Sequence, residues 1–247
     1  MPLREELERS GNWLFRWRSY IPIVLFVPMA LAMRHFDYPQ HEHALQECWA
    51  FICLGISLAG LGIRALTIGY TPKGTSGRNT HQGQIAEVLN TTGIYSVVRN
   101  PLYLGNYVIW LGISLFALTW WLTVIFTLCF WIYYERIVFA EEEYLRRKFG
   151  DDYVRWAEQT PVFFPRWTQW RRSALSFSWR TVLRREYSGL FAIVSCFFLL
   201  EVSEHLAVEH RLEFEPHWIA IFLAACALYV VLRTLNRHTQ LLHVNGR

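Results

Sequence analysis

Two polar stretches of the chain carry the side chains best suited to chemistry. The first ends on Arg99-Asn100-Pro101, and Asn followed by Pro is a strong signal for the start of a helix. A helix start presents unpaired backbone N–H groups and the positive end of the helix dipole, which together can hold an anion. The second stretch carries the carboxylates Glu141 and Glu142. The purely structural alternatives are a well-capped helix and a solvated helix stabilised by i,i+4 ion pairs.

An uncharged block between the two stretches predicts how they are placed. Residues 100–134 contain no Asp, Glu, Lys or Arg, and a single helix of that length would measure about 52 Å, whereas the hydrocarbon core of a bilayer is about 30 Å thick. We therefore predict a helical hairpin with its turn near residues 118–121. Because the arms of a hairpin are antiparallel, continuation of the second arm would bring Glu141 and Glu142 close to the helix start at Asn100.

The composition of the whole chain indicates an integral membrane protein. Of its 247 residues 53% are hydrophobic and 18% are charged, whereas about a quarter of a soluble domain is charged. The apolar content excludes intrinsic disorder, and the five Cys show neither CxxC nor metal-ligand spacing. We predict an all-α, polytopic transmembrane fold with about six spans in a single membrane domain, residues 1–247. The spans are expected at residues 20–36, 45–69, the two arms of 100–134, 186–207 and 217–236.

The basic residues predict the orientation of these spans. Of the 24 Lys and Arg, 22 fall on one side of the six spans, and only Arg34 and Arg211 fall on the other. Loops rich in Lys and Arg stay in the cytoplasm, so both termini and the two long connections are expected there. Residues 166–185 combine Arg with Trp and Phe, which predicts a cytoplasmic interfacial helical segment on an anionic leaflet. Nucleic-acid binding is not expected, because the flanking spans hold this segment at the membrane.

Several short motifs occur in a fixed order within residues 55–165. They are Thr92-Gly93-Ile94-Tyr95, then Arg99-Asn100-Pro101-Leu102-Tyr103-Leu104-Gly105, the uncharged hairpin, and Arg136 followed by Glu141-Glu142-x-x-Leu145-x-x-x-Phe149-Gly150-x-x-Tyr153. In this combination the chain resembles the isoprenylcysteine carboxyl methyltransferase family and the wider group that includes phospholipid N-methyltransferases. We expect residues 55–165 to form the methyltransferase core, whereas the resemblance does not cover the C-terminal transmembrane hairpin at 186–236. The family usually has His at the position of Asn100, so a role of that imidazole is not carried over.

The resemblance implies an integral membrane enzyme that uses S-adenosylmethionine. It assigns catalytic roles to Arg99, Arg136 and Glu142. It assigns cofactor binding to Tyr95, Asn100, Pro101, Tyr103, Gly105, Glu141 and Glu142. These residue types suit the cofactor, because its ammonium and sulfonium favour carboxylates, whereas its own carboxylate favours Arg or a helix N-terminus.

The residues of the candidate pocket also bear on the methyl acceptor. An anionic oxygen is already ionised and needs only positioning by Arg99, Arg136 or Arg155, whereas an amine must first be deprotonated. Because the candidate pocket contains no His to act as a base, we expect a lipid-borne carboxylate of the isoprenylcysteine type or a lipid phosphate. A phospholipid N-methyltransferase and a non-catalytic transporter or scaffold of the same architecture are the alternatives.

Acidic residues and His gather on the opposite side of the predicted spans. They are His35, His41, Glu42, His43, Glu201, Glu204, His205, Glu209, His210, Glu213, Glu215 and His217. Their spacings fit no standard metal signature, so no metal site is expected. Three Gly in the second span, Gly55, Gly60 and Gly62, follow no strand and are expected to permit close helix packing. A cleaved signal peptide is not expected, because the first 19 residues contain Glu5, Glu6 and Glu8.

Overall fold

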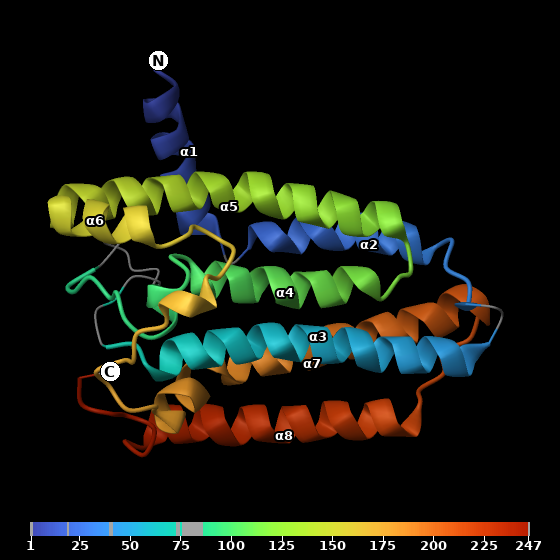
Figure 1. Ribbon diagram of the computed structural model, residues 1–247. Helices are drawn as coiled ribbons and strands as arrows, with labels where there is room; N and C mark the ends of the chain where they lie inside the picture. Colours follow the sequence, from blue (N-terminus) through green and yellow to red (C-terminus); the bar gives the residue numbers. More distant parts are fainter. Residues whose placement is uncertain (1, 19, 40–41, 73–74, 76–85, 247) are drawn as a thin grey trace.

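The computed structural model describes residues 2–18, 20–39, 42–72, 75 and 86–246, and this part of the chain is built from helices (Figure 1). The helices are α1 (Leu3–Trp17), α2 (Phe26–Met33), α3 (His43–Gly69), α4 (Pro101–Leu115), α5 (Trp120–Phe149), α6 (Asp151–Gln159), α7 (Trp179–Val208) and α8 (Pro216–His238). Short 3-10 helices occur at η1 (Ile21–Leu25), η3 (Ile94–Ser96) and η4 (Trp167–Gln169). The prediction of an all-α fold is confirmed.

The apolar helices agree roughly with the six predicted spans. Four of them, α3, α5, α7 and α8, are long and apolar enough to cross a bilayer, and α1 with η1 and α2 would make a fifth span if the bent pair crosses as one. Two of the predicted spans are shorter than expected. The first is interrupted by Pro22 and Pro28, so that α2 begins only at Phe26, and α4 has 15 residues. Proline removes a backbone donor and crowds the preceding turn, which explains the interruption.

The predicted hairpin is formed by α4 and α5. The helices are joined at residues 116–119, where Leu118 has a φ of 51°, and this turn overlaps the predicted one. The α5 helix then runs without a break for 30 residues to Phe149, well beyond the uncharged block. Its final turns therefore carry Glu141 and Glu142 past the start of α4, as the hairpin predicts.

The helices α2, α3, α4, α5, α7 and α8 run side by side, and α1 crosses α5 at one end of this bundle (Figure 1). The α3 helix packs against both α4 and α7 and forms the centre of the bundle. Its largest fully buried neighbours include Phe116, Phe197 and Trp218. A second apolar cluster forms where α1 meets α4 and α5, around Phe15, Tyr103 and Ile137. This second cluster supports the floor of the site described below.

The close approach of α3 and α4 depends on Gly60 alone among the three Gly predicted to pack helices. A Cβ atom on Gly60 would lie 2.6 Å from the carbonyl oxygen of Gly105 and 2.7 Å from the backbone nitrogen of Ile109. No atom lies within 4 Å of a Cβ built on Gly55 or Gly62. Backbone atoms cannot move aside without moving the whole helix, so the α3–α4 distance requires Gly at position 60.

Replacing Gly60 with Ala is therefore expected to lower the free energy of unfolding by about 1–3 kcal/mol, the usual cost of overpacking. Gly62→Ala is the matched control on the same helix, and it should leave stability unchanged or raise it by up to about 1 kcal/mol, because Ala favours helix more than Gly does. Thermal unfolding of both variants in the same detergent measures the difference. Equal unfolding midpoints for the two variants would contradict the packing geometry.

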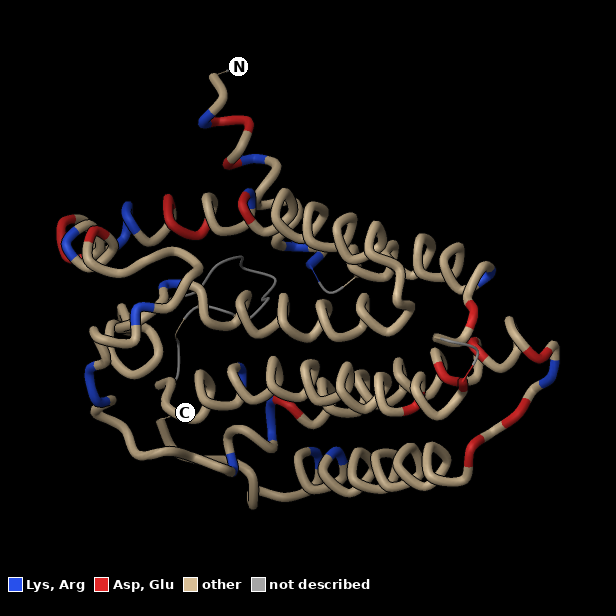
Figure 2. The backbone as a smooth tube through the Cα atoms, turned by 45° about the vertical axis from the view of Figure 1, so that its right-hand side comes forward, with Lys and Arg blue, Asp and Glu red and all other residues tan. Residues whose placement is uncertain are grey.

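The charged residues are divided between the two ends of the bundle (Figure 2). Most Lys and Arg lie at the end that holds both chain termini and the start of α4. Acidic residues dominate the other end, in the connections between α2 and α3 and between α7 and α8. The separation expected from the linear sequence is thus present in the three-dimensional arrangement.

Candidate active site

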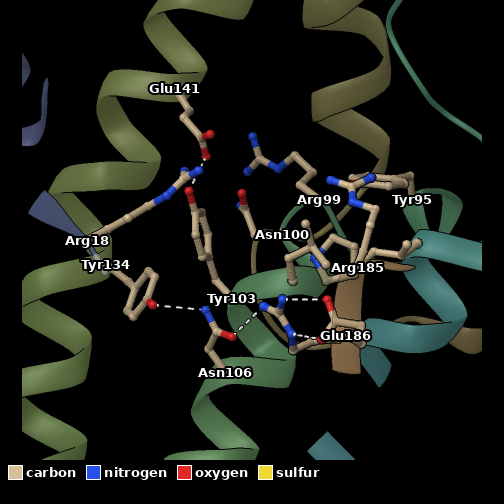
Figure 3. A pocket seen from close by; sticks show the side chains of 14 residues that line it. Arg18, Tyr95, Arg99, Asn100, Tyr103, Asn106, Tyr134, Glu141, Arg185 and Glu186 are labelled. Carbon is tan, nitrogen blue, oxygen red and sulfur yellow. Dashed lines mark hydrogen bonds and ion pairs between the residues drawn. The ribbon is translucent and has the colours of Figure 1, made fainter. Parts of the chain in front are cut away.

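A cavity of about 340 Å³ opens at the basic end of the bundle, between α3, the start of α4, the extension of α5 and the start of α7 (Figure 3). Its volume lies within the range of small-molecule sites, which is about 300–1,000 Å³. The lining residues are Arg18, Arg64, Ile68, Tyr95, Arg99, Asn100, Pro101, Leu102, Tyr103, Asn106, Tyr134, Glu141, Arg185 and Glu186. Four Arg and two Glu among them make it a charged site at the end of an apolar bundle.

The loop before α4 is held by backbone hydrogen bonds to a distant segment. Arg99 N donates to the carbonyl of Pro161 at 2.9 Å, and Arg166 N donates to the carbonyl of Val97, also at 2.9 Å. The side chains of Val97 and Val98 are fully buried below the loop. Gly93, which begins the turn, has a φ of 61°, a left-handed conformation that favours Gly. These contacts fix the backbone that presents Tyr95 and Arg99 to the cavity.

The start of α4 lies at the cavity as predicted, but the Asn100 side chain does not cap it. Asn100 occupies the N-cap position and Pro101 is the first helical residue, yet no side-chain cap hydrogen bond is made. The Asn100 amide instead donates to the carbonyl of Val162 at 3.3 Å. The predicted helix start at Asn100-Pro101 is therefore confirmed, whereas the Asn100 side chain is oriented toward the 160–164 segment. The uncapped first turn of α4 lines the cavity through Pro101 and Tyr103.

The two predicted carboxylates reach the site with different partners. The hydroxyl of Tyr103 donates to Glu141 Oε2 at 2.7 Å, and the Arg18 guanidinium points toward the same carboxylate (Figure 3). Glu142 forms an ion pair with Arg99, with 2.9 Å between Oε1 and Nη1. The Nε atom of Arg99 is buried and has no hydrogen-bond partner in the described part of the chain. A buried guanidinium donor of this kind is available to a ligand.

A smaller pocket adjoins the main cavity on the side of α6. It is lined by Thr75, Ala86, Val88, Leu89, Asn90, Tyr95, Arg99, Asn100, Glu141, Glu142, Leu145, Tyr153 and Trp156. Burial raises the pKa of Tyr95, and burial together with the Glu142 carboxylate raises that of Tyr153. Both phenols therefore stay neutral at physiological pH and offer a ring and a hydroxyl rather than a charge.

An ion pair that was not predicted from the sequence forms one wall of the cavity. Arg64 on α3 donates to both carboxylate oxygens of Glu186 on α7, at 2.8 and 2.7 Å, and to Asn106 Oδ1 at 2.6 Å. The Asn106 amide in turn donates to the hydroxyl of Tyr134 at 3.0 Å. Arg64 is the only Lys or Arg within the predicted span 45–69, and an isolated charge in a span is itself a signal for a functional site.

Two of the predicted site residues line neither the cavity nor the smaller pocket. Arg136 faces α1, where its Nη1 donates to Ser10 Oγ at 3.1 Å. Gly105 lies in the α3–α4 contact, and a Cβ at this position would be 2.6 Å from Cγ of Arg64. Arg155, the third Arg considered for acceptor binding, is exposed on α6 and pairs with Asp152. The structure therefore brings together Tyr95, Arg99, Asn100, Pro101, Tyr103, Glu141 and Glu142 and leaves out Arg136 and Gly105.

An apolar groove of about 470 Å³ borders the site between α5 and the 161–164 segment. Its lining residues are Phe130, Trp131, Tyr134, Glu135, Val138, Phe139, Glu142, Pro161, Val162, Phe163 and Phe164. Tyr134 also lines the main cavity, and Glu142 also lines the smaller pocket. A largely apolar surface thus leads directly to the charged side chains of the site.

Comparison with known proteins relates the chain to membrane methyltransferases. Residues 49–152 match the family model described as phospholipid methyltransferase. The nickel-cobalt-cadmium resistance protein NccN of Alcaligenes xylosoxydans xylosoxydans is 31% identical over 159 residues, 63% of this chain and 65% of that protein. The protein-S-isoprenylcysteine O-methyltransferase of Schizosaccharomyces pombe is 30% identical over 115 residues, 47% of each chain. The enzyme of the same name from Saccharomyces cerevisiae is 27% identical over 152 residues, 60% of this chain and 64% of that protein.

The extent of these matches is limited to part of each relative. The chain spans about half to two thirds of the length of the curated relatives it matches, between 47% and 65%. No solved structure matches the chain significantly. The matched residues 49–152 include most of α3, all of α4 and α5, and most of the residues that line the cavity, so the similarity falls on the part of the chain that builds the site.

Proposed function

We propose that this chain, whose residues 49–152 match the phospholipid methyltransferase family model, is a membrane methyltransferase that uses S-adenosylmethionine and modifies an anionic oxygen of a lipid-borne acceptor. The observation that carries the proposal is the convergence of Glu141, Glu142 and Arg99 at the uncapped start of α4, beside an apolar groove. A relative from Schizosaccharomyces pombe bears the name of an isoprenylcysteine O-methyltransferase, which agrees with this chemistry.

The residues of the site fit the charges of S-adenosylmethionine. Glu141 and Glu142 would attract its ammonium and sulfonium, and the first turn of α4 would attract its carboxylate. The unpartnered Nε of Arg99 supplies a further donor for that carboxylate. The neutral rings of Tyr95 and Tyr153 offer aromatic walls for the adenine. When bound, the cofactor supplies an electrophilic methyl group, and the contribution of the chain is to hold the acceptor oxygen in line with it.

The balance of charge in the cavity favours an anionic acceptor. Four Arg and two Glu line it, and one of these Glu, Glu186, is engaged by Arg64. This excess of Arg over Glu is suited to hold a carboxylate or a phosphate, which needs no proton removed before it reacts. Among the described residues that line the cavity there is no His to deprotonate an amine. This combination supports the oxygen acceptor over the phospholipid amine.

The apolar groove supports a lipid-borne acceptor. A prenyl or acyl chain gains about 0.8 kcal/mol for each CH₂ group that it buries, so a groove lined by Phe and Trp can supply much of the affinity. The shared residues Tyr134 and Glu142 would place the head group of such a lipid at the charged site. The tail would then remain among the helices while the oxygen reaches the cavity.

The distribution of Lys and Arg between the two ends of the bundle supports a cytoplasmic site. The end of the bundle that holds the cavity also holds both termini and most Lys and Arg (Figure 2). Positively charged ends of membrane proteins are retained in the cytoplasm, where a water-soluble cofactor would be available. Protease removal of a C-terminal tag from sealed vesicles of known orientation would test whether this end of the bundle lies in the cytoplasm.

A direct test uses the detergent-purified full chain with methyl-labelled S-adenosylmethionine and three acceptors. These are a prenylated cysteine with a free carboxylate, the same cysteine without the prenyl group, and phosphatidylethanolamine. We expect label on the prenylated compound alone, as a base-labile ester. Equal labelling of the unprenylated cysteine would refute the lipid requirement, and labelling of the phospholipid amine would refute the oxygen acceptor. Absence of cofactor binding in calorimetry would support the non-catalytic alternative.

The groove itself is tested by Phe164→Glu, at its exposed rim. A carboxylate there opposes entry of an apolar tail, so the KM for the prenylated acceptor should rise about tenfold, which corresponds to the loss of roughly 1.4 kcal/mol of apolar burial. Affinity for S-adenosylmethionine should not change. Trp170→Glu is the control, since this exposed aromatic residue is close in sequence but does not line the groove. An unchanged KM in Phe164→Glu would exclude the groove as the tail site.

A further inference from the structure

A second cluster of titratable side chains lies at the acidic end of the bundle, far along α7 from the cavity. It consists of His43 at the start of α3 and Glu201, Glu204 and His205 near the end of α7. One nitrogen or carboxylate oxygen from each of the four residues lies within 4.8 Å of all the others. The three α7 residues are at most 2% exposed. The cluster is therefore an enclosed set of two imidazoles and two carboxylates.

The atoms that face one another in this cluster have no hydrogen-bond partner in the described part of the chain. They are His43 Nε2, Glu201 Oε1, Glu201 Oε2, Glu204 Oε1 and His205 Nε2. The closest approaches between the two residue types are 3.7 Å for His43 with Glu204 and 3.9 Å for His205 with Glu201, too long for hydrogen bonds. Buried polar atoms are nearly always paired, and adjacent buried carboxylates repel each other. The unpaired atoms thus point to a cation that they would share.

The atoms turned away from the centre of the cluster do have partners. His205 Nδ1 lies 3.1 Å from the hydroxyl of Tyr38, with the Glu209 carboxylate 3.8 Å away on the same side of the ring. Gln46 donates to Glu204 Oε2 at 2.9 Å. Outer contacts of this kind orient the ligands of metal ions and fix which ring nitrogen is free to coordinate. Here they leave His205 Nε2 and Glu204 Oε1 directed into the cluster.

We propose that His43, Glu201, Glu204 and His205 bind a divalent transition metal of the zinc class. Two imidazole nitrogens and two carboxylate oxygens form a ligand set that Zn²⁺ accepts in tetrahedral sites, and imidazole ligands disfavour Mg²⁺ and Ca²⁺. With four protein ligands the ion would be structural and would join the start of α3 to the end of α7. The site is independent of the methyl-transfer proposal, because it lies at the other end of the bundle.

The sequence places these four residues on the same side of the spans but does not predict the site, because they do not follow one another at a metal-binding spacing. Glu201, Glu204 and His205 lie on one face of α7, three and four residues apart. The remaining ligand, His43, comes from the start of α3, which only the packing of α3 against α7 brings to that face. The expectation of no metal, drawn from spacing, is therefore replaced by this proposal.

The proposal is tested on the full chain in detergent after removal of metal with a chelator. Equilibrium dialysis against Zn²⁺, read by atomic emission, should give about one bound ion per chain, and Glu201→Gln and His205→Gln should each weaken binding at least about tenfold. His217→Gln is the matched control. This imidazole lies at the same end and pairs with Glu47 at 3.1 Å outside the cluster, so its loss should leave the stoichiometry unchanged.

A second measurement separates loss of binding from loss of folding. Glu201→Gln keeps the shape of the side chain and removes a buried charge, so the metal-free variant should fold and unfold at the same temperature as the metal-free parent or above it. Zn²⁺ should raise the melting temperature of the parent and of His217→Gln but not that of Glu201→Gln. Less than half an equivalent of Zn²⁺ on the parent, or the same Zn²⁺ shift in Glu201→Gln, would overturn the proposal.

Discussion

Replacing Glu142 with Gln is expected to reduce methyl transfer and S-adenosylmethionine affinity by about 100-fold. Glu142 forms the ion pair with Arg99 and lines the pocket that adjoins the main cavity. A charge-assisted contact with the bound cofactor contributes about 1.5–3 kcal/mol, and about 2.7 kcal/mol corresponds to two orders of magnitude in an equilibrium or a rate. Gln keeps the volume of the side chain, so the change isolates the charge. Calorimetry with the cofactor and the initial rate of label transfer measure the two effects.

The neighbouring residue provides the matched control for this change. Glu143 is buried on the same turn of α5, but its carboxylate pairs with Arg4 of α1 and lines neither pocket. Arg4 is largely exposed, and such pairs contribute only about 0–1 kcal/mol. Glu143→Gln should therefore retain cofactor affinity and rate within about twofold. If Glu142→Gln behaves like Glu143→Gln, the carboxylate at position 142 is not part of the site.

The comparison of these two adjacent Glu also shows what the sequence could and could not predict. The length of the uncharged block required a hairpin, and the hairpin required the end of α5 to pass the start of α4. The sequence did not show which face of α5 each side chain occupies. The α1 helix packs against one face of α5 at Gly11, and Arg136 and Glu143 lie on this face and bind side chains of α1. Arg136, which was predicted as a site residue, therefore faces α1 and lines neither the cavity nor the adjoining pocket.

Contacts between residues far apart in the chain account for the other missed features. The side-chain amide of Asn100 donates to the carbonyl of Val162, because the 161–164 segment returns to the start of α4. Two other features join α3 to α7. They are the ion pair of Arg64 with Glu186 and the cluster around His205. Helix periodicity and charge counts describe each span separately, so pairs between spans become visible only once the packing of α3 on α7 is known.

The pair of Arg64 with Glu186 leads to the second prediction of large effect. Its two hydrogen bonds hold α3 to α7 beside the cavity, and the Glu186 side chain is only 6% exposed. Replacing Glu186 with Gln leaves the Arg64 charge without its counter-ion in an apolar bundle. We expect the free energy of unfolding to fall by about 3–5 kcal/mol, the usual cost of breaking a buried pair. Thermal or denaturant unfolding in detergent measures the loss, and a loss below about 1 kcal/mol would contradict a buried pair.

The double variant Arg64→Met with Glu186→Met separates stability from function. Removing both charges leaves no unpaired ion, and apolar replacements of buried pairs are often neutral, so stability should recover to within about 2 kcal/mol of the parent. The residual loss reflects Asn106, whose carbonyl oxygen would lose the Arg64 donor. Methyl transfer should not recover, because Arg64 and Asn106 shape the wall of the cavity through Tyr134. A stable double variant with full activity would mean that this pair serves only to hold the helices together.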